Sequence, residues 1–220
     1  MFARHRDYYR AAALERFEWL DHGFGTRHSV WIPEDSHVSL RQVHSGIVLL
    51  GERPGCLGVG DGLVTARAGL PLVVRTADCL PVLIADPERR AVAAIHAGWR
   101  GVLHNIAGAA VARLAAEFAS QPASLHAAIG PGIGACCFEV GPEVAALFKP
   151  LLPERTDLNI STRLDLVEIL RRQLDAAGIP AANIAAGAPC TFCAGDEFHS
   201  WRRDRPDAGR MQSFIVIRDW

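Results

Sequence analysis

Short apolar blocks, each bounded by glycine, proline or polar residues, recur through most of the chain. Valine, isoleucine and leucine dominate these blocks, and short runs of this kind between turn residues are typical of buried strands. The pattern predicts strands at Ser39–Val43, Ile47–Leu50, Gly62–Thr65, Pro71–Arg75, Leu80–Ala85, Ala91–Ala97, Leu125–Gly130 and Phe214–Arg218.

Two longer segments place apolar residues three and four positions apart, which is the spacing of one helix face. The first predicts a helix from Val102 to Ala119, and the second predicts a helix over Leu164–Ala177, with Gly178 in the position where helices end. A short helix is expected at Pro142–Phe148. Helices that alternate with strands indicate an α/β fold.

Composition narrows the classes of function. The chain has 220 residues, of which half are hydrophobic and 21% are charged, and its net charge of −1 includes no Lys/Arg block. We therefore expect one domain over residues 1–220, with no nucleic-acid partner and no membrane partner. No signal peptide and no apolar run of about 20 residues is evident, so we expect a cytoplasmic protein whose six cysteines are reduced.

One thiol and two imidazoles stand beside predicted strands, at Cys79, His44 and His96. Together they can form three corners of a tetrahedral metal site whose fourth position is open, as in catalytic zinc sites. Their long separations in the sequence leave two other interpretations open. The cysteine can be an apolar filler beside hydrogen-bonded histidines, or a nucleophile that an adjacent histidine activates.

Several neighbours favour chemistry over packing alone. Asp61 and Asp78 are candidates to hold a ligand imidazole through its second nitrogen, and Asp78 is also a candidate for proton handling, beside an equally plausible structural role. Arg41, Arg75 and Arg100 are candidates to bind an anionic group, although a surface salt bridge is the favoured role of Arg75. Trp99 can stack on a planar base or belong to the core.

Seven blocks, in order along nearly the whole chain, resemble one family. They are Arg41-Gln-Val-His44, Gly60-Asp-Gly-Leu-Val-Thr65, Thr76-Ala-Asp-Cys-Leu-Pro-Val82, His96-Ala-Gly-Trp-Arg-Gly101, Ile129 to Gly141, Cys190-Thr191 and Phe198 to Asp204. The family is the one historically named laccase-domain or multicopper polyphenol oxidase and now described as purine nucleoside phosphorylases with adenosine deaminase activity. Some bacterial members are called peptidoglycan editing factors.

The resemblance implies a mixed-sheet α/β sandwich, purine nucleoside substrates and a catalytic zinc whose ligands here are His44, Cys79 and His96. We assign Arg27, Trp99 and Cys136 to substrate binding. The segment between Arg27 and Arg41 is shorter than is usual in the family. We expect the missing residues to alter the rim of the pocket, and so substrate preference more than metal binding.

Rival metal constellations are weaker. Cys137, Cys190 and Cys193, with Glu139, mimic the zinc nucleoside deaminases, but the two halves lie far apart and Val-Gly-Pro after Glu139 breaks the helix on which that glutamate should lie. The favoured alternative is that cysteines 136, 137 and 190 line a packed loop near the cleft. A copper cofactor is judged unlikely, because a multicopper centre needs His-x-His pairs and the sequence has none.

The resulting prediction is a zinc enzyme whose partners are a small-molecule nucleoside and phosphate. Arg41 or Arg100 would orient phosphate for phosphorolysis of adenosine, inosine or methylthioadenosine, and zinc would activate water for deamination of adenosine. Two alternatives come from other classes. One is a metal-free hydrolase with Cys79 as nucleophile, cutting an amide in a muropeptide, and the other is a non-catalytic binding module.

Overall fold

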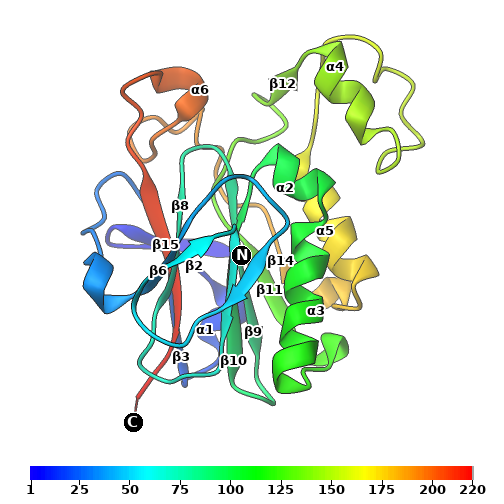
Figure 1. Ribbon diagram of the computed structural model, residues 1–220. Coiled ribbons are helices and arrows are strands. Elements are labelled where there is room, and N and C mark those ends of the chain that lie inside the picture. Colours follow the sequence, from blue (N-terminus) through cyan, green and yellow to red (C-terminus); the bar gives the residue numbers. More distant parts are fainter. Residues whose placement is uncertain (220) are drawn as a thin grey trace.

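Two β-sheets lie face to face in the computed structural model, which describes residues 1–219, and helices cover the outer face of one sheet (Figure 1). The first sheet has the order β1 (Phe2–His5), β2 (Tyr8–Ala11), β3 (Leu20–Gly25), β15 (Met211–Ile217), β8 (Leu72–Thr76), β4 (Val38–Arg41) and β6 (Gly55–Val59). The second has the order β14 (Ile184–Ala185), β11 (His126–Ile129), β9 (Leu80–Asp86), β10 (Ala91–Ala97), β7 (Gly62–Thr65) and β5 (Val48–Leu50).

Both sheets combine parallel and antiparallel neighbours. Strand β15 is antiparallel to β3 and β8, whereas β4 is parallel to β8 and β6. In the second sheet β9, β10 and β11 are antiparallel, and β5 and β14 are parallel to their neighbours. The predicted mixed-sheet α/β fold is therefore confirmed.

The continuous apolar runs of the sequence form the strands that lie between two layers. Successive side chains of a strand point to opposite faces. In β9, Val82 and Ile84 pack in the core beneath the helices, while Leu83 packs in the core between the sheets. Every residue of β9 and β10 is buried. A polar side chain introduced at most of these positions would be removed from water without gaining a hydrogen-bond partner, which is destabilising.

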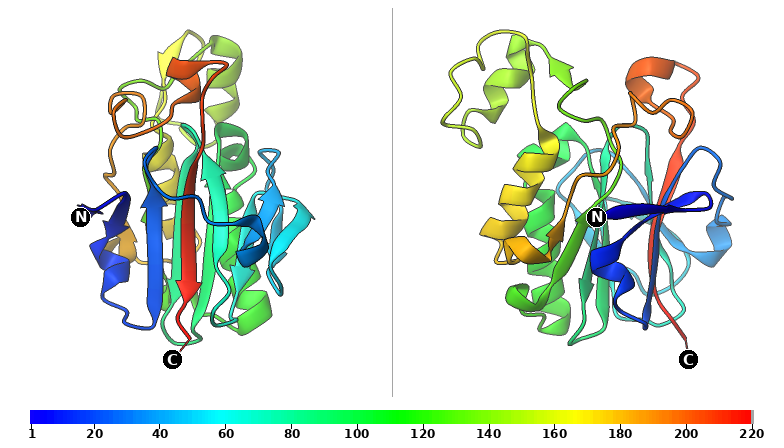
Figure 2. Two further views of the ribbon diagram at one scale, coloured as in Figure 1. Left: turned by 90° about the vertical axis from the view of Figure 1, so that its left-hand side faces the viewer. Right: turned by 180° about the vertical axis from the view of Figure 1, so that it is seen from behind.

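Helices α3 (Ile106–Phe118) and α5 (Leu166–Ala176) form the outer layer (Figure 2). The prediction of one helix over Val102–Ala119 was wrong, because α2 (Trp99–Leu103) ends before α3 begins. Asn105 separates them with a left-handed φ of 52°, and its side chain accepts the Gly108 N–H and caps α3. The second predicted helix is present, capped by Asp165.

The remaining elements are short. They are helices α1 (Ala12–Glu15), α4 (Pro142–Ala145) and α6 (Trp201–Asp204), the strand pair β12 (Glu139–Val140) and β13 (Thr162–Arg163), and 3₁₀ turns at Glu34–Ser36, Pro122–Ser124, Ala146–Phe148 and Ala181–Asn183. The loops that carry β12, α4 and α6 rise above one end of the two sheets (Figure 1). Within residues 1–219, no helix has both the length and the apolar character needed to cross a bilayer.

Candidate active site

The three candidate ligands converge at the end of the sheets beneath these loops. His44 follows β4, Cys79 lies between β8 and β9, and His96 belongs to β10. One ligand atom from each side chain lies within 4.8 Å of the other two. The two imidazole rings meet edge to face with their centroids 4.9 Å apart. Three residues that are distant in sequence thus form one group.

Asp61 holds both histidines of this group. Its carboxylate is fully buried and lies 2.8 Å from His96 Nδ1. The same carboxylate accepts the backbone N–H groups of Val43, His44 and Ser45 at 3.1, 2.9 and 2.6 Å, and also the Ser45 hydroxyl. Burial opposes its ionisation, but the bonds from His96, Ser45 and His44 prevail and hold the pKa of Asp61 well below its usual range. His96 Nε2 is left as the nitrogen available to a metal.

Two residues of the site have the left-handed backbone conformation, which residues other than glycine rarely adopt. They are His44, with φ 64°, and Asp78, with φ 82°. The Asp61 carboxylate stabilises the first through the His44 N–H. Such strain persists only where surrounding contacts enforce it, and it gathers at functional sites.

Asp78 fixes the backbone next to Cys79. Its carboxylate accepts hydrogen bonds from Thr191 Oγ1 at 2.7 Å, Ser200 Oγ at 3.0 Å and the Arg202 N–H at 2.7 Å. Thr191 lies in the loop before α6, Ser200 is the N-cap of α6, and Arg202 belongs to α6 itself. Of the two carboxylates proposed from the sequence to orient an imidazole, Asp61 is therefore the one bonded to a histidine, whereas Asp78 ties Cys79 to the loops above.

Gly98 leaves the space in which the ligand group packs. A Cβ atom at this position would lie 2.6 Å from His44 Cδ2 and 3.0 Å from Cys79 Sγ. Any larger residue would push the imidazole and the thiol away from each other. The glycine of the His-Ala-Gly-Trp block is thus required by the close approach of two candidate ligands.

The electrostatics of the group favour a thiolate. Burial alone would raise the pKa of Cys79, but the bonds and charges of His44 and His96 outweigh it and lower the pKa to about 6. Burial likewise opposes the charged form of His96, but Asp61 and the thiolate raise its pKa to about 9. A thiolate is the form of cysteine that binds a metal.

The donor set fits a metal ion. Two imidazoles and one thiolate suit zinc, and three protein ligands leave one coordination position for water or substrate. Within residues 1–219 this is the only histidine-containing group with metal-ligand geometry.

The ligand group lines a cavity of about 830 Å³, a size typical of small-molecule sites. Five arginines share its wall: Arg75, Arg100, Arg202, Arg205 and Arg210. Asp78 and Glu139 are the acidic residues in that wall. The excess of guanidinium groups favours an anionic ligand.

Aromatic rings accompany the arginines. The Arg100 guanidinium lies 4.0 Å from the centre of the Trp99 ring, and those of Arg205 and Arg210 lie 5.7 and 5.5 Å from Trp201. Trp99, Trp201 and Phe138 all line the cavity. Flat rings and flat guanidinium groups offer stacking surfaces for a planar base.

The residues assigned from the sequence divide into two sets. Trp99, Arg100 and Asp78 line the cavity with the three ligands, and Arg75 lines it while pairing with Glu34 at 2.6 Å. Arg27, Arg41 and Cys136 do not line it in the described part of the chain. Arg27 donates to the Gly195 carbonyl at 2.7 Å, Arg41 is exposed at the end of β4, and Cys136 lies among other cysteines.

Sequence reasoning missed part of the wall. Phe138, Trp201, Arg202 and Arg205 belong to or adjoin the blocks Ile129 to Gly141 and Phe198 to Asp204. Their basic and aromatic composition was the available signal, but the topology had to bring the two blocks together. Arg210 carried no signal, since it belongs to a loop rich in charged residues.

The segment between Arg27 and β4 contacts the wall at Arg75, but none of its residues lines the cavity in the described part of the chain. Trp31 lies 5.3 Å from the Arg75 guanidinium, and the Ile32 backbone makes two hydrogen bonds with the Gln212 amide. The segment therefore lies behind Arg75. Its effect on substrate preference stays a prediction.

Comparison with known proteins gives consistent matches. The family described as "Multi-copper polyphenol oxidoreductase laccase" matches residues 25–218. The chain is 39% identical to "Purine nucleoside phosphorylase YlmD" of Geobacillus stearothermophilus, over 72% of this chain and 60% of that protein. It is 36% identical to "Adenosine deaminase RL5" of an unknown prokaryotic organism, over 80% of this chain and 73% of that protein.

A solved structure agrees with the fold. The crystal structure of YlmD from Geobacillus stearothermophilus superposes with a TM-score of 0.90 at 29% identity, covering 99% of both chains. In the sequence match, however, the aligned region spans less than two thirds of that relative's length. The description of the family and the names of both relatives each denote an enzyme.

Proposed function

The chain belongs to the multi-copper polyphenol oxidoreductase laccase family, and from this premise we propose that it is a zinc enzyme of purine nucleosides. Its reactions are the phosphorolysis of adenosine, inosine and methylthioadenosine and the deamination of adenosine. The observation that carries the proposal is a three-ligand group, His44, Cys79 and His96, in the wall of a cavity rich in arginine and aromatic side chains.

The cavity wall suits both reactants of a phosphorolysis, the purine nucleoside and the phosphate. A purine is planar and stacks on Trp99 or Trp201, and a phosphate dianion pairs with guanidinium groups such as that of Arg100. In phosphorolysis a phosphate oxygen forms a bond to the ribose anomeric carbon while the bond to the base breaks. The base leaves with that electron pair and takes up a proton. Arg100 would orient the phosphate oxygen for this attack.

A metal ion held by the ligand group would stabilise the negative charge that develops on the leaving base. Zinc bound there supplies a Lewis acid, which withdraws electrons from the group it contacts. Asp61 would keep His96 in the orientation and tautomer that expose Nε2, and Asp78 would keep Cys79 in place. In deamination water adds to the purine C6 and ammonia leaves, which converts adenosine to inosine.

A multicopper oxidation receives no support from the ligand count. Several copper ions need many imidazoles, whereas the described residues bring two histidines to one shared group. The family's older description and the chemistry of this site therefore differ.

The test is chromatography of adenosine, inosine and methylthioadenosine after incubation with the protein, with and without phosphate. Release of free base that needs phosphate is expected for phosphorolysis, and inosine formed from adenosine without phosphate is expected for deamination. Cys56→Ala is the matched control for Cys79→Ala, since Cys56 is exposed and belongs neither to the ligand group nor to the lining of the cavity. If fully zinc-loaded protein forms neither free base nor inosine, the proposal is refuted.

A second candidate is the metal-free hydrolase of a muropeptide amide, with Cys79 as nucleophile. It is favoured by the pKa of Cys79, which the two histidines lower to about 6. Metal analysis separates the candidates. Zinc that is lost together with activity in Cys79→Ala and His96→Ala supports the zinc enzyme, and an active zinc-free preparation that alkylation of Cys79 inactivates supports the hydrolase.

A further inference from the structure

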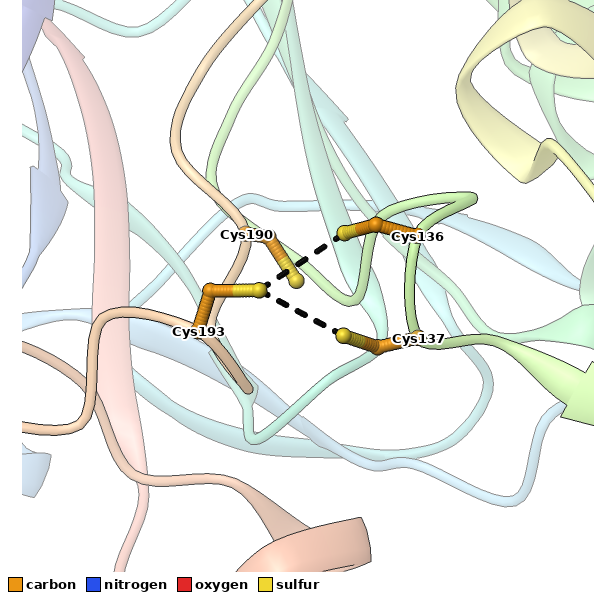
Figure 3. Close-up of side chains that lie close together, drawn as sticks. All are labelled: Cys136, Cys137, Cys190 and Cys193. Atoms are coloured by element: carbon orange, nitrogen blue, oxygen red, sulfur yellow. Dashed lines mark hydrogen bonds between the residues drawn. The ribbon is translucent and has the colours of Figure 1, made fainter.

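Four cysteines outside the active-site cavity point toward one centre (Figure 3). Cys136 and Cys137 come from the turn after β11, and Cys190 and Cys193 come from the loop before α6. Their sulfur atoms all lie within 4.8 Å of one another. Cys193 Sγ is 3.7 Å from Cys136 Sγ and 3.4 Å from Cys137 Sγ. We call this group the four-cysteine cluster.

We propose that the four-cysteine cluster holds a second zinc ion, which is structural. Four sulfurs about 2.3 Å from one zinc ion lie about 3.8 Å apart at the corners of a tetrahedron. The two printed separations, 3.4 and 3.7 Å, are close to that edge. A cluster of several irons spreads its thiolates over different irons and so holds them farther apart. The spacing of the cluster therefore favours a single ion.

The surrounding backbone suits a group of thiolates. The Gly134 N–H donates to Cys190 Sγ at 3.2 Å. A Cβ on Gly134 would lie 3.3 Å from Cys136 Sγ and 3.5 Å from Cys190 Sγ, so glycine permits the close approach. N–H donors aimed at sulfur stabilise its negative charge.

A guanidinium group lies close to the cluster. The Arg203 side chain donates to the carbonyls of Thr191 and Phe192, the two residues between Cys190 and Cys193, at 2.9 Å each. Four thiolates around a divalent ion carry a net charge of −2, because each thiol releases its proton to solvent when the ion binds. Arg203 also pairs with Asp204 at 2.6 Å, so its main role here is to hold the loop between Cys190 and Cys193 in place.

Exposure gives a second reason for an ion. Cys136 and Cys193 are exposed, yet all four thiols are free and in mutual contact. An oxidant that reaches two exposed thiols in contact links them into a disulfide. Coordination protects them, and structural zinc sites of four cysteines have no open position at which chemistry can occur.

The same closure argues against a deaminase-type site built on these cysteines. A fourth thiol, Cys136, joins the three that the sequence offered, so all four corners of a tetrahedron are occupied. Glu139, the residue that completes the deaminase-like pattern of the sequence, lines the active-site cavity instead. Any catalytic metal belongs to the histidine-containing group.

The position of the cluster indicates what the ion would stabilise. It joins the segment that contributes Phe138 and Glu139 to the cavity with the segment that contributes Trp201 and Arg202. A backbone bridge between Gly132 and Cys190 joins the same two segments, and the Thr191–Asp78 hydrogen bond ties the second of them to the loop that carries Cys79. The ion would therefore brace two walls of the active-site cavity against each other.

The test is zinc content by mass spectrometry of the purified protein, normalised to protein concentration. We expect two zinc ions per chain in the unmodified protein and in Cys56→Ser. One ion is expected in the double variant Cys137→Ser/Cys193→Ser, and one in Cys79→Ala. An unchanged zinc content in the double variant would overturn the proposal, as would iron in place of zinc or a disulfide found by mass in the native protein.

X-ray absorption at the zinc edge keeps the proposal testable if the double variant fails to fold. In Cys79→Ala, where the active-site group is incomplete, the remaining zinc should have sulfur ligands alone. Nitrogen ligands on that zinc would contradict the assignment. This result does not depend on the proposed function, because a missing enzymatic activity would leave the sulfur-only signal intact.

Discussion

The active-site ligand group (His44, Cys79 and His96) and the four-cysteine cluster offer similar metal-binding atoms in different settings. The first takes three ligands from strands and strand ends and opens on a cavity of about 830 Å³. The second takes four thiols from two loops and lies partly exposed at the surface. A metal ion held by the three ligands would keep one coordination position open for chemistry, whereas an ion held by the four thiolates would have none and would brace the loops that carry them.

The largest expected effects come from removing one ligand of each group. The loss should lower activity at the first group and stability at the second. His96→Ala should lower phosphorolysis about 1000-fold, because a lost Lewis acid costs several kcal/mol of transition-state stabilisation. Cys193→Ser should instead lower Tm by about 10 °C, because a structural metal contributes directly to folding. Steady-state kinetics and calorimetry on both variants check this. The reverse pattern would exchange the roles of the two groups.

Removing the support beneath a ligand should have the next largest effect. Asp61→Asn keeps the shape but loses the charge that fixes His96 and receives the His44 N–H. We expect zinc affinity at the active site to fall about 10- to 100-fold, with the sulfur-bound zinc unchanged. Competition with a chelator measures both ions in one titration. Equal weakening of both would show general unfolding in place of a local defect.

The cavity wall offers a smaller and more specific effect. Arg100→Ala should raise the KM for phosphate about tenfold, the loss expected for one charged hydrogen bond. Arg41→Ala, which removes an exposed arginine outside the wall, should change KM less than about twofold. Kinetics with phosphate as the varied substrate distinguish them. A larger effect at Arg41 would restore the role that the sequence first suggested for it.

The pH response of the thiols gives the subtlest contrast. In metal-free protein the histidines lower the pKa of Cys79 to about 6, whereas burial and the neighbouring Cys193 raise the pKa of Cys137. Alkylation of Cys79 should therefore rise with a midpoint at about pH 6, while Cys137 stays unreactive at neutral pH. Mass spectrometry of the labelled peptides follows each thiol. A Cys79 midpoint near its ordinary pKa of 9.0 would contradict the arrangement.

The same shifts set a stability window for metal-free protein. The lowered pKa of Cys79 gives stability that is present above pH 9 and is lost as pH falls through about 6. The raised pKa of His96 gives stability that is present below pH 6.5 and is lost as pH rises through about 9. The thiolate–imidazolium pair is therefore populated between about pH 6 and 9.

Regular hydrophobic patterns predicted the regular parts of the fold. The runs Gly62–Thr65 and Ala91–Ala97 became β7 and β10 with the same bounds. Strands β1 to β3 were missed, because they contain no valine or isoleucine and consist mostly of polar, aromatic, alanine and glycine residues. In β3, for example, a Cβ on Gly25 would lie 2.3 Å from the Gln212 carbonyl oxygen, so close strand approach selects glycine over β-forming residues. The break at Asn105 depends on a single cap, which apolar spacing does not reveal.

The site divides in the same way. Cysteine and histidine beside strand runs could be recognised locally, and the resemblance of the blocks grouped them. The arginines of the wall and the meeting of Cys136 and Cys137 with Cys190 and Cys193 depend on how two distant loops pack. The four cysteines stand in two pairs that are more than 50 residues apart in the sequence, so their common centre exists only in three dimensions.

The most direct test of the zinc-enzyme account is an anomalous-difference map at the zinc edge, from crystals of active protein soaked with inosine and phosphate. We predict a peak within bonding distance of a His44 ring nitrogen, Cys79 Sγ and His96 Nε2, with the nucleoside beside it in the arginine-lined cavity. Density for nucleoside or phosphate elsewhere, or an active crystal with no peak at the three ligands, would contradict it.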